Sequence, residues 1–64
     1  MTIATSIRIL AVDDHPILLE GLAAVIRSQT DMILVGEARN GREGVQQFRG
    51  LQPDVVLMDL RLPA

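Results

Sequence analysis

The chain has 64 residues, a formal net charge of −2 and no cysteine, which limits it to one domain with no disulfide and no thiolate metal site. Its acidic balance and its single aromatic residue, Phe48, give no basis for direct nucleic-acid binding through charge or base stacking. Its apolar runs are too short for a membrane span or a secretory signal. The absence of cysteine fits a reducing compartment, and we expect a cytoplasmic location.

The N-terminal part of the chain predicts a strand, a helix and a second strand. Residues 1–6 are expected to form a short leader, and the β-branched and apolar residues 7–12 predict the first strand. Pro16 suits the first position of a helix, with Asp14 or His15 as the preceding cap. In this helix one apolar stripe is expected at i, i+4, i+7 and i+8, formed by Leu18, Leu22, Val25 and Ile26.

The C-terminal part predicts one more strand, a weaker helix and a third strand. Residues 32–36 predict a buried strand whose pattern weakens through residues 37–38, and the Asn-Gly pair at 40–41 predicts a turn that ends it. Residues 42–49 predict a helix that turns Val45 and Phe48 inward and stops at Gly50.

The third strand, residues 55–58, ends on a carboxylate, Asp59. Its continuous apolar run predicts burial on both faces, and Pro53 and Pro63 bound it. Asp59 is therefore expected at the carboxyl edge of a sheet, where α/β proteins bind their ligands. A lone aspartate at such a place is more often a solvated strand end than a functional residue.

Alternating strands and helices with short connections predict an α/β fold with a parallel sheet in the order 2-1-3. The carboxyl ends of the first and third strands would then lie about 4.8 Å apart, so that Asp13 and Asp14 crowd Asp59. Two negative charges about 4 Å apart repel by roughly 4 kcal/mol near a protein surface, which a proton or a cation can relieve.

Oxygen donors of this kind favour a hard ion such as Mg²⁺. Helix capping is the alternative role for Asp13 and Asp14. His15 is expected to be a partly exposed loop residue rather than a ligand. Arg61 is expected to be solvated, although its main-chain oxygen could help to coordinate an ion.

The chain resembles the N-terminal part of a response-regulator receiver domain, and is most similar to the branch that usually carries a C-terminal helix-turn-helix output domain. The matching segments are Val12-Asp13-Asp14-His15-Pro16, Val35-Gly36-Glu37-Ala38, Asn40-Gly41, Pro53 to Asp59, and Leu60-Arg61-Leu62-Pro63. The resemblance implies a flavodoxin-like fold. Residues 7–64 would form the first βαβαβ half of it and end after the third strand.

The resemblance also implies a function in two-component signalling and transcription regulation. Asp59 would accept a phosphoryl group from a sensor histidine kinase. Asp13, Asp14, Asp59 and the main-chain oxygen of Arg61 would hold Mg²⁺. The chain would be a phosphoacceptor rather than an enzyme. The hydroxyl residue and the lysine that the family places on later strands fall beyond residue 64, so phosphorylation is expected to be impaired in this short form.

Two other functions remain open from the sequence. An open, apolar third-strand edge predicts homo-oligomers, and the chain could be a self-associating structural half-domain without phosphotransfer. A Mg²⁺-dependent phosphatase with an aspartyl nucleophile is disfavoured, because such sites usually want a second aspartate two residues later and Arg61 stands there.

Overall fold

The computed structural model describes residues 6–59, which form five elements in alternating order. Strands and helices follow one another as β1 (Ile7–Val12), α1 (Pro16–Arg27), β2 (Met32–Ala38), α2 (Gly41–Leu51) and β3 (Val55–Met58). The predicted alternation is confirmed. Most of the expected leader, and Arg61, lie outside the described residues.

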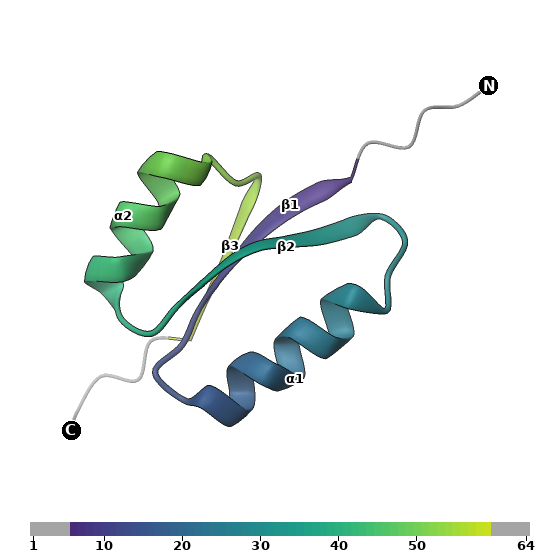
Figure 1. The fold of residues 1–64 in the computed structure, drawn as a ribbon, viewed down its shortest axis with the longest axis horizontal. Helices are drawn as coiled ribbons and strands as arrows, with labels where there is room; N and C mark the ends of the chain where they lie inside the picture. The colour runs from purple at the N-terminus through teal and green to yellow at the C-terminus, as the bar shows by residue number, and fades with distance from the viewer. Residues whose placement is uncertain (1–5, 60–64) are drawn as a thin grey trace.

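The three strands form one parallel sheet in the order β2-β1-β3, which confirms the predicted topology. From β1 the chain crosses to β2 on one side, and from β2 it returns past β1 to β3. Because both crossovers are expected to be right-handed, this reversal places α1 and α2 on opposite faces of the sheet (Figure 1). The reversal point lies between β1 and β3, which is where α/β sheets open a crevice for ligands.

The core is centred on β1, the middle strand. Leu10 and Ala11 are completely shielded from solvent. On one face of the sheet α1 adds its own buried residues, which are Leu19, Ala23 and Ile26. On the other face Leu10, Val12 and Ala38 form a cluster against which Val56 packs. The middle strand is therefore the rigid support from which its C-terminal residues project.

The predicted apolar stripe of α1 is confirmed at Ile26 and wrong at Leu18 and Val25. Leu19, Ala23 and Ile26 are buried, whereas Leu18 is 41% and Val25 is 60% exposed. Apolar residues occupy more than one face of α1, so the 3.6-residue period fits two overlapping stripes. Only one of these faces meets the sheet, and the sequence pattern alone does not say which.

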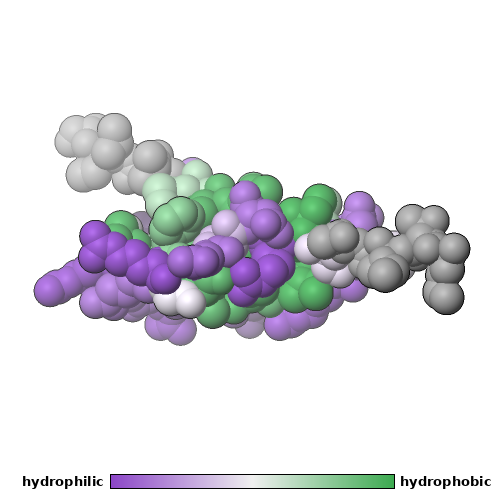
Figure 2. Space-filling model, turned by 90° about the horizontal axis from the view of Figure 1, so that it is seen from above, coloured by the Kyte–Doolittle hydropathy of each residue, from purple (hydrophilic) through white to green (hydrophobic). Residues whose placement is uncertain are grey.

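The predicted burial of residues 55–58 on both faces is also wrong. Val55, Leu57 and Met58 remain 37–44% exposed, because β3 is an edge strand that pairs only with β1 among the described elements. Val45 and Phe48, expected to point inward, are each about half exposed. Figure 2 shows apolar residues at the surface between hydrophilic ones on one face of the molecule.

Helix α2 extends further at both ends than residues 42–49. At its start the Asn40 side chain accepts a hydrogen bond from the Glu43 backbone N–H at 2.8 Å, a typical N-cap contact. Gly50 does not stop the helix, because it continues to Leu51 and closes at Gln52, which adopts a left-handed conformation with φ 49°. This cap leads the chain directly into β3.

Candidate functional site

The register of the sheet brings two aspartates to the same edge. Val12 of β1 pairs with Met58 of β3, so Asp13 and Asp59 are the next residues along two parallel neighbours. Two backbone hydrogen bonds fix these positions: Asp59 N–H donates to the Val12 oxygen at 3.1 Å, and Asp13 N–H donates to the Ala38 oxygen at 3.0 Å. The placement of both residues thus follows from strand pairing and does not depend on a loop.

A cavity of about 160 Å³ opens at this edge of the sheet. Its lining residues come from the ends of β1, β2 and β3 and from the start of α2: Val12, Asp13, Asp14, Arg39, Asn40, Gly41, Met58 and Asp59. The structure therefore gathers the three aspartates that the sequence singled out around one cavity. Arg61, the fourth predicted ligand, lies outside the described residues.

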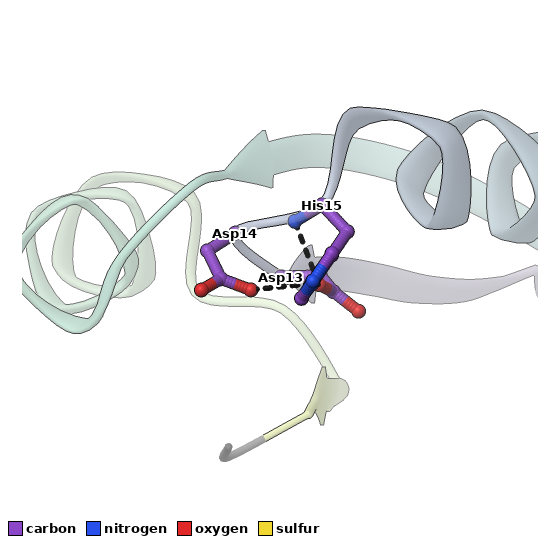
Figure 3. A group of neighbouring side chains, drawn as sticks. All are labelled: Asp13, Asp14 and His15. Carbon is purple, nitrogen blue, oxygen red and sulfur yellow. Dashed lines mark hydrogen bonds and ion pairs between the residues drawn. The ribbon is translucent and has the colours of Figure 1, made fainter. Parts of the chain in front are cut away.

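Asp13, Asp14 and His15 form a compact group just before α1 (Figure 3). Asp13 is only 3% exposed, and its Oδ1 accepts a hydrogen bond from the His15 backbone N–H at 2.9 Å. The His15 Nδ1 lies 3.2 Å from Asp13 Oδ1 and 2.6 Å from Asp14 Oδ1. A buried carboxylate is costly without such partners, so Asp13 is held in a defined position.

The capping role expected for Asp14 or His15 is realised only in part. His15 is the N-cap residue of α1 by its backbone conformation, and Pro16 follows as the first helical residue, as predicted. The His15 side chain makes no capping hydrogen bond and lies beside the two carboxylates. It is 43% exposed, which agrees with the expected partial exposure.

The oxygen donors in this group suit a divalent cation. Asp13, Asp14 and His15 can each offer one ligand atom, and these atoms lie within 4.8 Å of one another. Carboxylate oxygens prefer hard ions such as Mg²⁺, whereas an imidazole also suits softer metals. The sequence had not placed His15 within this group. The sequence does place the histidine next to the two acids, and this adjacency could have indicated a shared site. It does not show how the His15 ring is oriented.

Arg39 is a second residue of the site that the sequence analysis did not select. It follows β2 directly, and among the described residues it is the only basic one that lines the cavity. The cavity also reaches Gly41, the first residue of α2, where the positive end of a helix dipole favours anions. The edge therefore combines three carboxylates with a source of positive charge.

A comparison with known protein families identifies the class of protein to which these features belong. The chain matches the response regulator receiver domain family over residues 9–64, and it belongs to that family. The resemblance inferred from the acidic pair and from the end of the third strand is thereby confirmed.

Individual relatives agree with this assignment. The chain is 44% identical over 55 residues to the nitrate/nitrite response regulator NarL of Escherichia coli K12. It is 50% identical over 54 residues to the transcriptional regulatory protein LiaR of Bacillus subtilis. These matches cover 86% and 84% of this chain but only 26% of each relative, so the chain spans about a quarter of their length.

Solved structures of other proteins have a similar fold. The response regulator domain of Thermotoga maritima CheB superimposes with a TM-score of 0.86 at 43% identity. The match covers 91% of this chain and 43% of that one. The flavodoxin-like receiver fold, present here as its β1-to-β3 part, is confirmed.

Within residues 6–59, neither helix has the length and apolar character needed to cross a membrane.

Proposed function

We propose that this chain is a phosphoacceptor module of two-component signalling in which Asp59 receives the phosphoryl group. One observation carries the proposal: Asp59 directly follows β3, as Asp13 directly follows β1 after the last strand pair, Val12 with Met58, and Asp59 shares a cavity with Asp13 and Asp14. A carboxylate at the open edge of a rigid sheet can act as a nucleophile, provided that neighbouring charges are neutralised.

The cavity fits Mg²⁺ by the chemistry of its donors. Asp13 is buried, and with Asp14 it presents carboxylate oxygens beside Asp59, which is the hard, anionic donor set that Mg²⁺ prefers. In our proposal Asp13, Asp14 and Asp59 hold the ion, together with the main-chain oxygen of Arg61. When bound, the ion neutralises phosphoryl oxygens and thereby lowers the repulsion that the carboxylates exert on them.

The proposed reaction transfers a phosphoryl group from a phosphohistidine of a sensor kinase. A carboxylate oxygen of Asp59 forms a bond to phosphorus while the P–N bond of the donor breaks. The imidazole nitrogen of the donor keeps the electron pair of that bond and takes up a proton. Asp59 becomes an acyl phosphate, and no oxidant or further reactant is needed.

The wider role is proposed by analogy with the relatives. NarL is a nitrate/nitrite response regulator and LiaR is a transcriptional regulatory protein. We therefore propose that phosphorylation of Asp59 regulates transcription through another part of the whole protein. We propose further that the module acts in the cytoplasm as the partner of a sensor histidine kinase. In this proposal the segment accepts phosphate and does not itself contact nucleic acid.

Intact-mass measurement with a small phosphodonor tests the proposal. Incubation with phosphoramidate and Mg²⁺ should add one phosphoryl group to a fraction of the wild-type chain, because phosphorylation is expected to be impaired in this short form, and removal of Mg²⁺ with a chelator should prevent the addition. Asp59→Asn should stay unmodified. Asp31→Asn, which changes an exposed aspartate in the turn before β2, should be phosphorylated like the wild type. An unmodified wild-type chain, or a modified Asp59→Asn chain, would contradict the proposal.

The exposed edge of β3 favours a second candidate function, a self-associating half-domain. Val55 and Leu57 are 40% and 37% exposed on a strand whose outer edge has no partner among the described elements. Such an edge can pair with another chain. In this alternative two copies meet along β3 and the aspartates take no part in phosphotransfer.

Sedimentation velocity distinguishes this alternative. Self-association predicts that the average mass rises with concentration and that Leu57→Lys shifts the chain towards monomer, because a lysine on an edge strand opposes pairing. Ile33→Lys, at an exposed position of the other edge strand, is the matched control and should leave the mass unchanged. A wild-type chain that stays monomeric at tens of micromolar would rule the alternative out.

A further inference from the structure

The dipeptide formed by Asn40 and Gly41 lies where the chain passes from β2 into α2. Asn40 is the only asparagine of the sequence, and both residues are exposed. No atom lies within 4 Å of the Cβ that a side chain at Gly41 would have, so the main chain is uncrowded at this point. A glycine after an asparagine lets its backbone nitrogen reach the side-chain amide more easily than any other residue does, because no side chain obstructs the approach.

Three hydrogen bonds hold this dipeptide in place. Asn40 Oδ1 accepts from the Glu43 N–H at 2.8 Å, and the Asn40 backbone oxygen accepts from the Gly44 N–H at 3.0 Å. Glu43 Oε1 in turn accepts from the Arg39 N–H at 3.0 Å. The amide side chain is therefore engaged as the cap of α2, and its reaction with the main chain depends on how often this first turn opens.

The backbone conformation of Asn40 gives a second reason why the cap must open. The residue is extended, with ψ 171°, whereas a ring between its Cγ and the next nitrogen needs that nitrogen close to eclipsing its Cβ. Rotation about the Cα–C bond to reach that arrangement carries the Asn40 oxygen away from the Gly44 N–H that donates to it. Ring closure and the capped first turn of α2 therefore exclude one another.

We propose that Asn40 is a site of spontaneous deamidation and that the cap of α2 controls its rate. The Gly41 nitrogen, after losing its proton to hydroxide, forms a bond to Asn40 Cγ. The Cγ–Nδ2 bond breaks, and Nδ2 keeps the electron pair, takes up a proton and leaves as ammonia. Water then opens the cyclic imide at one of its two carbonyl carbons, and the ring nitrogen recovers a proton. Position 40 becomes aspartate or isoaspartate, and no oxidant or reductant is needed.

The modification changes the wall of the candidate site. Asn40 lines the same cavity as Asp13 and Asp59, so deamidation replaces a neutral amide there by a carboxylate. An aspartate at the N-cap position still caps the helix, whereas isoaspartate inserts a methylene group into the main chain between β2 and α2. The inference does not depend on phosphotransfer, because it requires only the asparagine–glycine sequence and the cap.

Mass spectrometry of the whole chain, and of a peptide that contains position 40, tests the inference during incubation at mildly alkaline pH with and without urea. The urea-unfolded chain should deamidate about two- to thirtyfold faster than the folded chain, the range that N-cap free energies give. Glu43→Ala removes the acceptor of the Arg39 N–H. It should speed deamidation of the folded chain by about two- to tenfold, as expected for one lost hydrogen bond, and leave the rate in urea unchanged.

Two matched variants separate the chemistry from the structure, and circular dichroism checks that each variant is folded. Glu43→Gln keeps an acceptor oxygen and should deamidate at a rate close to that of the wild type. Gly41→Ala adds a methyl group in open space, which crowds the attacking nitrogen without disturbing the packing. This variant should keep most of its asparagine, folded or unfolded, over the time in which the wild type converts.

The outcomes that overturn the inference are distinct. A folded chain that stays unmodified while the urea-unfolded chain converts shows that position 40 is not modified in the folded protein. Equal rates in the folded and unfolded chains, or no acceleration in folded Glu43→Ala, overturn control by the cap. Equal rates in Gly41→Ala and wild type overturn the proposed ring closure.

Discussion

Gly36 in β2 illustrates how one residue controls the packing of the sheet against α2. A Cβ atom at this position would collide with the Gln47 side chain and would lie 2.7 Å from Leu51 Cδ1. Gly36→Ala should therefore destabilise the chain by about 1–3 kcal/mol, the usual cost of overpacking. Urea unfolding followed by circular dichroism measures the change.

Gly21→Ala is a control for which we expect the opposite change in stability. Gly21 lies within α1, and no atom lies within 4 Å of its hypothetical Cβ. Alanine favours the helix over glycine by about 1 kcal/mol, so this variant should be more stable than wild type. A Gly36→Ala chain as stable as wild type would mean that α2 packs less closely on β2 than described.

Gln52 adopts the left-handed conformation at the C-cap of α2. Because a residue with a Cβ pays about 1–2 kcal/mol for this conformation and glycine does not, Gln52→Gly should stabilise the chain by up to about 1 kcal/mol. The Arg8 side chain donates to the Gln52 backbone oxygen, a contact that the substitution keeps. A lower midpoint of urea unfolding for Gln52→Gly would contradict the assigned cap.

At the residue scale, the sequence predicted what backbone pairing controls and missed what side-chain rotation controls. Asp13 and Asp59 could be predicted as neighbours because both follow apolar strands whose ends meet at one sheet edge. The contacts of His15 and the place of Arg39 depend on the loops after β1 and β2. Sequence periodicity carries no information about such loops.

At the scale of elements, the start of α2 depends on the cap at Asn40. The Asn40 side chain accepts from the Glu43 N–H at 2.8 Å, so Asn40→Ala should cost about 0.5–2 kcal/mol. Thermal unfolding should show the loss, while Gln46→Ala, at an exposed position within the same helix, should have little effect. Equal behaviour of the two variants would show that the cap contributes nothing to stability.

The elements themselves were largely predictable, but the faces they bury were not. Apolar runs predicted all three strands, and short connections predicted their parallel order. The stripe of α1 was misplaced because apolar residues surround much of that helix. Leu57 and Met58 were misjudged because an apolar run indicates that a strand can be buried, whereas burial depends on which neighbours are present.

At the scale of the whole molecule, the account depends on a single topological fact. The chain reverses direction across the sheet after β2, so β1 and β3 become neighbours. Their C-terminal ends then bring the Asp13–Asp14 pair and Asp59, which are far apart in sequence, around one cavity. The proposed mechanism requires that these groups act together.

A Mg²⁺ titration followed residue by residue in ¹⁵N–¹H spectra tests this central claim most directly. The amides of Asp13, Asp14 and Asp59 should shift together along one binding curve, and Asp13→Asn should weaken the response at Asp59 as well as at Asp14. Shifts confined to Asp13 and Asp14, with Asp59 unaffected at saturating Mg²⁺, would show that the two strand ends do not form one site.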